Sequence, residues 1–399
     1  MMNWPVTETE AQARLEAFLP HAGGDYARQR NFDFGAEDRS NVSALSPWIR
    51  HGVLSESAVL ARVLAVHNEK SAEKFIQEVV WRGYFKGWLE HRPGVWDGYC
   101  ADRDAGLAAL EQNSGLRKAY GEAVDGRTGI EAFDHWAREL VETGYLHNHA
   151  RMWFASIWIF TLNLPWALGA DFFFRHLLDG DPASNTCSWR WVAGLHTPGK
   201  HYIARADNIA KFTAGRFDPA DQLNESADPV EFENINPDPE LPDLPMIAEP
   251  RGKAGWLLTP DSASDKAFRV DLPVLGLALP DLRSPLEMGG LARSFEINAL
   301  KLRCGQGGTV DLPQSADQAA GRVTQWVRDQ ALETVCLPYI AAGPYGDLAP
   351  RLLSAIRAAG AEPLIITRRY DRAVWPFAAK GFFKLKSKIP AILRQLDLA

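Results

Sequence analysis

The hydrophobic periodicity changes once along the chain, and this change restricts the fold more than any other feature. Apolar residues recur at spacings of three and four, which is typical of helices, in residues 11–19, 58–65, 75–89, 130–140 and 152–162. The C-terminal part instead alternates helical or loop segments with short apolar runs at 255–259, 273–279, 309–313, 334–340 and 362–367. Buried strands that alternate with helices form parallel sheets. The sequence therefore predicts a multi-domain α and α/β protein, with an all-helical N-terminal domain and a parallel, Rossmann-like α/β domain after it.

An acidic stretch separates the two halves. Residues 218–250 hold ten acidic residues and no basic one, and they are rich in proline, which is typical of an extended linker. The expected domains are therefore residues 1–217 and 251–399, joined by this linker. The net charge of −7 does not exclude a local basic surface. The richest basic run is either a solvated helix face or a phosphate-binding surface, and it consists of Lys380, Lys384, Lys386, Lys388 and Arg394.

The cysteines and the apolar runs exclude several classes of protein. The four cysteines lie far apart and form no CxxC pair, which excludes a disulfide scaffold, a zinc ribbon and a typical iron–sulfur ligand set. The most apolar run, residues 152–170, is interrupted by Asn163 and Pro165, so a buried helix fits it better than a membrane span. The first residues lack the basic and apolar regions of a signal peptide. We expect a soluble, monomeric, cytoplasmic protein with no metal site and no membrane partner.

Charged side chains interrupt an otherwise apolar region between residues 143 and 191. Buried charges are costly unless they are paired or bound to a ligand. From the residues alone, this group is either a structural salt bridge or a binding site, and its members are Asn148, Arg151, Asp179, Asp181 and Asn185. The fourteen tryptophans by themselves are explained by bulky core packing.

Five segments, in order, resemble the FAD-binding helical domain of the DNA photolyase/cryptochrome family. Besides Tyr26, they are ALSPWIRHG (44–52), FIQEVVWRGYF (75–85), GRTGIEAFD (126–134), TGYLHNHARMWFAS (143–156) and LLDGDPASNTCSWRWVAG (177–194). A single match of this kind would be weak evidence, whereas five in order are specific. The resemblance implies FAD as the cofactor and UV-damaged DNA as the partner.

The resemblance also implies which residues bind the cofactor. The FAD diphosphate would be held by Tyr26, Ser43, Leu45 and Ser46, with Arg82 paired to a phosphate. The groups around the isoalloxazine ring would be Asn148, Arg151, Asp179 and Asp181. Asn185 would face flavin N5, where its amide carbonyl oxygen can accept a hydrogen bond from the N5–H group. Plant cryptochromes carry an acid at that position, so the asparagine is more similar to photolyases.

Three positions match the substrate pocket of cyclobutane pyrimidine dimer photolyases. Glu78 would hydrogen-bond the flipped bases, Trp81 would stack on them, and Met152 would fill the apolar side of the pocket. Flipped-base pockets need such stacking and edge hydrogen bonds, although Trp81 and Met152 could equally be core residues. Together with Asn185, these three are the candidate catalytic residues.

A chain of tryptophans would carry electrons from the surface to the flavin. By resemblance its members, from the flavin outward, are Trp189, Trp166 and Trp96, with Trp191 or Trp158 as alternatives to the last.

The C-terminal half resembles the antenna-type α/β domain that this family normally places first. We therefore predict a circular permutation, joined by the acidic linker. The arginines usual in the first turn of that domain are absent from residues 259–268, which argues against a bound antenna chromophore, although the domain would allow one. Further departures are Ala44 and Gly83, which replace a basic and an acidic residue of the family pattern, and the segment 199–219.

The predicted function is light-driven repair of cyclobutane pyrimidine dimers by electron transfer from reduced FAD. One alternative is a cryptochrome-like blue-light sensor that has the same flavin and tryptophan chain but no repair activity. Another is a light-independent, flavin-bearing interaction module. Glu78, Trp81 and Met152 favour repair over both, whereas the altered segment 199–219 counts against it.

Overall fold

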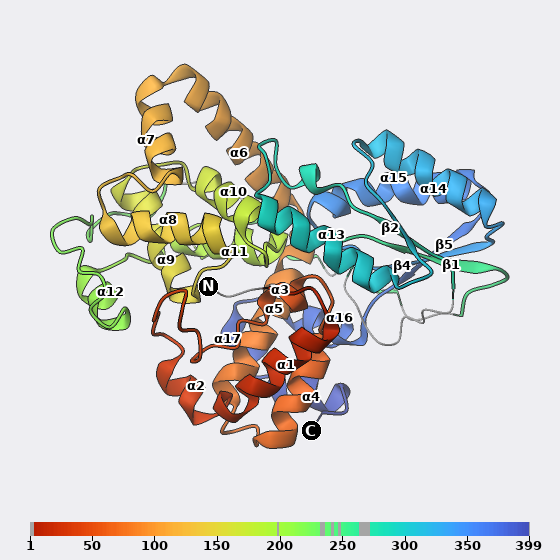
Figure 1. The fold of residues 1–399 in the computed structure, drawn as a ribbon, viewed down its shortest axis with the longest axis horizontal. Coiled ribbons are helices and arrows are strands. Elements are labelled where there is room, and N and C mark those ends of the chain that lie inside the picture. Colours follow the sequence, from red (N-terminus) through yellow and green to blue (C-terminus); the bar gives the residue numbers. More distant parts are fainter. Residues whose placement is uncertain are drawn as a thin grey trace.

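The computed structural model describes residues 4–197, 199–231, 236–240, 243–245, 249–262 and 272–398. It confirms the predicted fold class: a helical part lies beside a parallel α/β part (Figure 1). The helical part consists of α1 (Glu8–Phe18), α2 (Gly24–Gln29), α3 (Ser46–Arg50), α4 (Glu56–Val66), α5 (Glu73–Glu90), α6 (Gly94–Gln112), α7 (Ser114–Val124), α8 (Glu131–Thr143), α9 (Asn148–Ser156), α10 (Trp166–His176), α11 (Pro182–Ala193) and α12 (Ala206–Phe212). The side chains of Thr7 and Ser55 cap α1 and α4 by accepting backbone N–H groups, as expected at helix starts.

The most apolar run of the sequence forms two buried helices rather than one. Helix α9 ends at Ser156, a wider turn covers Ile157–Thr161, and α10 begins at Trp166 after Pro165. Proline at this point prevents a continuous helix because it lacks the backbone N–H donor. Within the described part of the chain, no helix is both long and apolar enough to cross a bilayer.

The α/β part is built on a five-stranded parallel sheet in the order β3-β2-β1-β4-β5. Alternate side chains of β1 enter two separate cores: Leu257 faces α14 and α15, whereas Trp256 and Leu258 face α13. Both faces of the sheet are therefore covered, as parallel sheets require. The elements are β1 (Ala254–Leu258), β2 (Val274–Leu277), α13 (Gly290–Cys304), β3 (Thr309–Asp311), α14 (Ala316–Asp329), β4 (Thr334–Pro338), α15 (Pro344–Ala358) and β5 (Glu362–Ile366).

The last three helices leave the sheet and join the core of the helical part. They are α16 (Arg369–Val374), α17 (Phe382–Lys386) and α18 (Ile389–Gln395). Tyr370 donates a hydrogen bond from its hydroxyl to the carbonyl oxygen of Val79 on α5, at 3.2 Å. A Cβ atom at Gly83 would lie 2.9 Å from that hydroxyl, and one at Gly87 would lie 2.8 Å from Cβ of Ala378. Close packing of these helices on α5 thus leaves little space for a side chain at position 83.

Buried ion pairs also connect the two parts. Arg50 of α3 pairs with Asp261, which follows β1. Arg368, just before α16, lies 2.7 Å from Glu56 of α4. Arg283 pairs with Glu296 of α13 and donates to the carbonyl oxygen of Phe174 on α10, at 3.2 Å. Because unpaired buried charges are strongly unfavourable, these contacts fix how the helices and the sheet meet.

Candidate cofactor and substrate pocket

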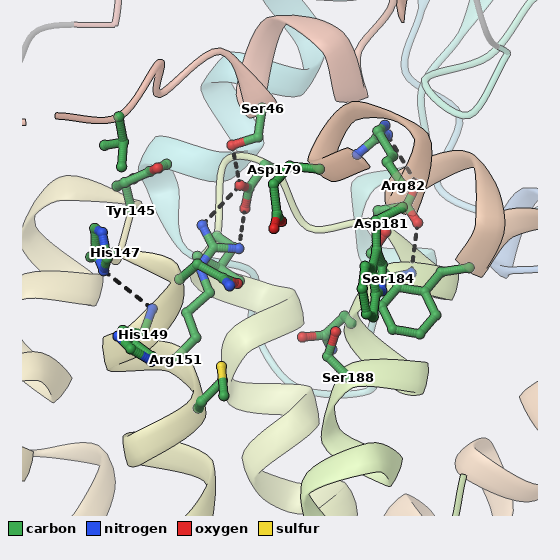
Figure 2. Close-up of a pocket in the computed structure, with 18 of the residues that line it drawn as sticks. Ser46, Arg82, Tyr145, His147, His149, Arg151, Asp179, Asp181, Ser184 and Ser188 are labelled. Carbon is green, nitrogen blue, oxygen red and sulfur yellow. Dashed lines mark hydrogen bonds and ion pairs between the residues drawn. The ribbon is translucent and has the colours of Figure 1, made fainter. Parts of the chain in front are cut away.

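A cavity of about 580 Å³ opens between the loop before α3 and helices α5, α9 and α11 (Figure 2). Its size lies within the range of small-molecule and cofactor sites. The cavity brings together most of the residues that the sequence predicts for cofactor and substrate, namely Tyr26, Ser43, Leu45, Ser46, Glu78, Trp81, Arg82, Asn148, Arg151, Met152, Asp179, Asp181, Asn185 and Trp189. Trp166 and Trp96 lie outside its lining.

A partly buried arginine–carboxylate pair forms one wall of the cavity (Figure 2). Arg151 on α9 donates two parallel hydrogen bonds to Asp179, at 3.0 and 2.8 Å. Ser46 at the start of α3 donates to the same carboxylate, and Arg151 Nε donates to the carbonyl oxygen of Leu146 at 2.9 Å. Burial acts to lower the pKa of Arg151, but Asp179 outweighs it and raises that pKa. The guanidinium therefore stays charged and fixed beside the cavity.

Asn185 presents a defined group to the cavity. Its amide nitrogen donates to the carbonyl oxygen of Ala170 on α10, at 2.8 Å. Because this bond uses the NH₂ group, the amide carbonyl oxygen is the atom suited to accept a hydrogen bond from a ligand. The start of α11 is fixed by Asp181, whose carboxylate accepts the backbone N–H of Ser184 at 2.8 Å.

Asp181 lies among three cations, which the sequence did not indicate. Its carboxylate is 3.2 Å from Arg82, 3.3 Å from Lys86 and 3.8 Å from Arg50. Burial acts to raise the pKa of Asp181, but these cations reverse the effect and hold it far below its usual value. Arg82 also lies 3.5 Å from Glu56. Its described partners are thus carboxylates, and its predicted contact with an FAD phosphate stays a prediction.

The predicted substrate residues share the cavity with the predicted cofactor residues. Glu78 pairs with Arg30, which lies one helical turn after Tyr26 and could have been found from that spacing. Burial raises the pKa of Glu78, although Arg30 opposes this. Trp81 stacks on Phe382 of α17, with ring centroids 3.8 Å apart. No sequence signal pointed to Phe382, because it lies about 300 residues away and belongs to the other half of the chain.

The aromatic residues continue from the cavity into the helical core. Trp189 is buried in the cavity wall, 5.1 Å from Phe173 and 6.3 Å from Trp158 between ring centroids. Trp166 and Trp96 both contact Tyr99, at 5.9 and 5.2 Å.

Trp96 does not lie at the surface, as a chain leading out through it would require. It is only 3% exposed, because α15 covers it and Asp347 of that helix accepts its indole N–H at 2.9 Å. Trp191, one of the predicted alternatives, is 37% exposed and lines the cavity. The outer end of the tryptophan chain thus stays a prediction.

The chemistry of the cavity fits a flavin nucleotide. It combines aromatic walls, a fixed cation–carboxylate pair and amide and hydroxyl groups, which suit a planar heterocycle that carries polar edges and a phosphate tail. In addition, His147 lines the cavity and its buried Nε2 has no hydrogen-bond partner among the described residues. Burial lowers the pKa of His147 to about 4, so the ring is neutral at pH 7 and can bond a polar ligand atom.

Comparisons with known proteins agree with this chemistry. The family model described as "FAD binding domain of DNA photolyase" matches residues 75–224. A deoxyribodipyrimidine photo-lyase of Neurospora crassa is 28% identical over 287 residues, which are 69% of this chain and 43% of that protein. A Synechococcus sp. enzyme of the same name is 34% identical over 216 residues, or 52% of this chain and 43% of the relative.

A solved class III photolyase from Agrobacterium tumefaciens is 28% identical, with a TM-score of 0.42, and the match covers 52% of this chain and 43% of that one. The chain spans less than half the length of the curated relatives that it matches. The family model and the curated relatives show that the helical part of this chain is similar to the FAD-binding domain of DNA photolyases.

Proposed function

We propose that the protein is an FAD-dependent lyase that uses light to repair cyclobutane pyrimidine dimers in UV-damaged DNA. The observation that carries this proposal is the composition of the cavity. Glu78, Trp81 and Met152 lie in the same cavity as Arg151 and Asn185. A cofactor and an extrahelical base would therefore meet without protein between them.

The cofactor side would act by fixed electrostatics. When bound, reduced FAD supplies the electron that opens the dimer after excitation by light. The pair with Asp179 fixes the Arg151 guanidinium at the wall, where its N–H groups would stabilise negative charge on a neighbouring ring system. The carbonyl oxygen of Asn185 would accept a ring N–H, and the hydroxyl of Ser43, which also lines the cavity, would be available to the diphosphate. The hydroxyl of Ser46 instead donates to Asp179 and helps to hold that carboxylate.

The substrate side would position the two fused bases. Glu78 pairs with Arg30, so its carboxylate is held at the cavity as an acceptor and would hydrogen-bond a base N–H. Trp81 offers a ring for stacking, and Phe382 supports the indole from another side. A side chain locked in this way is pre-organised for its ligand.

The C-terminal half is proposed to be the antenna-type domain of the family in a permuted position. In an open parallel sheet of this order, ligands bind at the carboxyl ends of β1 and β4, where the strand order reverses. In the described residues, the space at this point is only about 10 Å³, between Asp261, Ala341 and Pro182 of α11. Residues 263–271, which follow β1, lie outside the described residues. The absence of an antenna chromophore therefore stays a proposal that rests on the missing arginines in residues 259–268.

The test is light-driven repair by matched variants. Purified, reduced protein is illuminated with a dimer-containing oligonucleotide, and restored thymine is measured per absorbed photon. Glu78→Ala should keep FAD and its photoreduction but repair less efficiently, because it removes a pocket hydrogen bond worth about 1–3 kcal/mol. Glu111→Ala, which changes an exposed glutamate on α6, is the control and should repair like the wild type.

Two outcomes separate the alternatives. A wild type that photoreduces FAD but restores no thymine would replace this proposal with the light-sensor function. If Glu78→Ala repairs as well as the wild type does, the repair activity stands but Glu78 has no role in it.

A further inference from the structure

Helix α17 exposes an aromatic ring beside the cavity. Phe383 is 83% exposed, the most exposed large apolar side chain in the described part of the protein. Its neighbour Phe382 is buried and stacks on Trp81, which lines the cavity. Two consecutive residues thus connect a solvent-exposed ring to the proposed substrate side. The Phe383 ring is therefore accessible to a binding partner.

The same segment carries unpaired positive charge. Lys380, Lys384 and Lys388 are exposed, and among the residues that the structure describes no carboxylate forms an ion pair with them. Lys386 is different, because its Nζ lies 3.1 Å from Glu73 at the start of α5. Helix α17 therefore contacts α5 at two places, through Phe382 on Trp81 and through Lys386 at Glu73. Figure 1 shows the two helices next to each other. We call Lys380, Phe383, Lys384 and Lys388 the α17 surface.

We propose that the α17 surface holds duplex DNA beside the cavity, with the lysines on backbone phosphates and Phe383 inserted into the base stack. The inference rests on the proposed function and extends it to the undamaged part of the substrate. Flipping a dimer out of a duplex leaves a gap in the stack and costs unstacking energy. Apolar side chains inserted between bases offset such a cost in other DNA-binding proteins.

Charge complementarity selects DNA as the occupant. Three exposed lysines within five residues of Phe383, without an ion pair among the described residues, match a polyanion that has stacked bases. Phosphates attract the lysines, and bases offer a flat apolar face. The placement next to Trp81 adds a geometric reason. A base pair adjoining an extrahelical dimer must lie just outside the cavity that receives it.

The experiment measures binding of the full-length protein to three DNA probes. They are a duplex with one thymine dimer, the same damaged strand alone, and the undamaged duplex, each in a salt series. Phe383→Ala should weaken binding of the damaged duplex about tenfold and leave binding of the single strand unchanged, because a single strand has no gap to fill. Leu312→Ala, which removes another exposed apolar side chain beyond β3, is the control and should change neither.

The lysines have a separate readout. In the triple variant Lys380→Ala/Lys384→Ala/Lys388→Ala, the slope of log affinity against log salt concentration should become less steep by about 2–3. Each phosphate contact on a duplex contributes about 0.9 to this slope. All these residues are exposed, so the variants should keep their far-UV circular dichroism and flavin content.

Several results would overturn the inference. They are unchanged binding of the damaged duplex by Phe383→Ala, an equal loss on the single strand, or an unchanged salt slope in the lysine variant. Phe383-dependent binding to phosphatidylserine vesicles without an effect on duplex would assign the surface to a lipid partner instead. If the wild type does not distinguish damaged from undamaged duplex, the proposed function itself is contradicted. If the wild type does distinguish them and Phe383→Ala binds the damaged duplex equally well, only the inference about the α17 surface is contradicted.

Discussion

Replacing Asp179 by asparagine measures how much the Arg151–Asp179 pair at the cavity wall contributes to the free energy of unfolding. Asp179→Asn keeps the size of the side chain but removes the charge that faces Arg151. It also replaces one acceptor oxygen with an NH₂ group, so at most one of the two hydrogen bonds of 3.0 and 2.8 Å can remain. Removing one partner of a buried pair costs about 3–5 kcal/mol. The Arg151 side chain is 23% exposed and regains some hydration, so we expect the lower end, about 3 kcal/mol.

The assay is urea unfolding of the FAD-free protein, followed by tryptophan fluorescence. Glu16→Gln is the matched control, because Arg62 also holds Glu16 through two bonds of 2.7 Å, but on the surface. Exposed pairs contribute little, so the control should not differ measurably from the wild type. If Asp179→Asn costs no more than Glu16→Gln, the pair does not stabilise the cavity wall and the argument for a fixed charge there fails.

Three further predictions concern electron transfer, acid stability and packing. Trp189→Phe should keep FAD but slow its photoreduction by at least about tenfold in transient absorption, since phenylalanine is far harder to oxidise; an unchanged rate would exclude Trp189 as the donor. Burial lowers the pKa of His176 to about 4, so the unfolded chain binds more protons between about pH 4 and 6.5 and stability falls as the pH drops through this window. In His176→Asn, the free energy of unfolding should depend on pH less steeply within this window, by up to about 1.4 kcal/mol per pH unit, and a slope identical to that of the wild type would refute this. Gly83→Ala should destabilise by about 1–3 kcal/mol in thermal unfolding, because its Cβ would meet Tyr370, whereas Gly121→Ala, which meets no atom, should not destabilise.

The sequence predicted the elements well where the apolar pattern was long and regular. The change from helical spacing to short runs located both parts and all five strands. It did not predict the change in hydrogen bonding within the helical run 152–162, where the α-helical pattern of α9 ends at Ser156 and a wider helical turn covers Ile157–Thr161. Local spacing does not encode such a change in hydrogen bonding.

The site was predictable where its residues lie close together in the sequence. Arg151, Asp179 and Asn185 stand out as polar groups in an apolar region, and the structure places them in one cavity. Partners from distant segments could not be predicted, because they depend on how the two parts pack. Phe382 behind Trp81 and Asp347 above Trp96 are examples, since both come from the C-terminal half.

The account depends most on the claim that the cavity of about 580 Å³ binds FAD. The direct measurement is the flavin content of the purified full-length protein, released by denaturation and identified by chromatography. We expect a yellow protein that releases one FAD per chain, and a flavin-free preparation that regains the same amount on incubation with FAD. A colourless protein that cannot be reconstituted with FAD would contradict the assignment of the cavity and every step built on it.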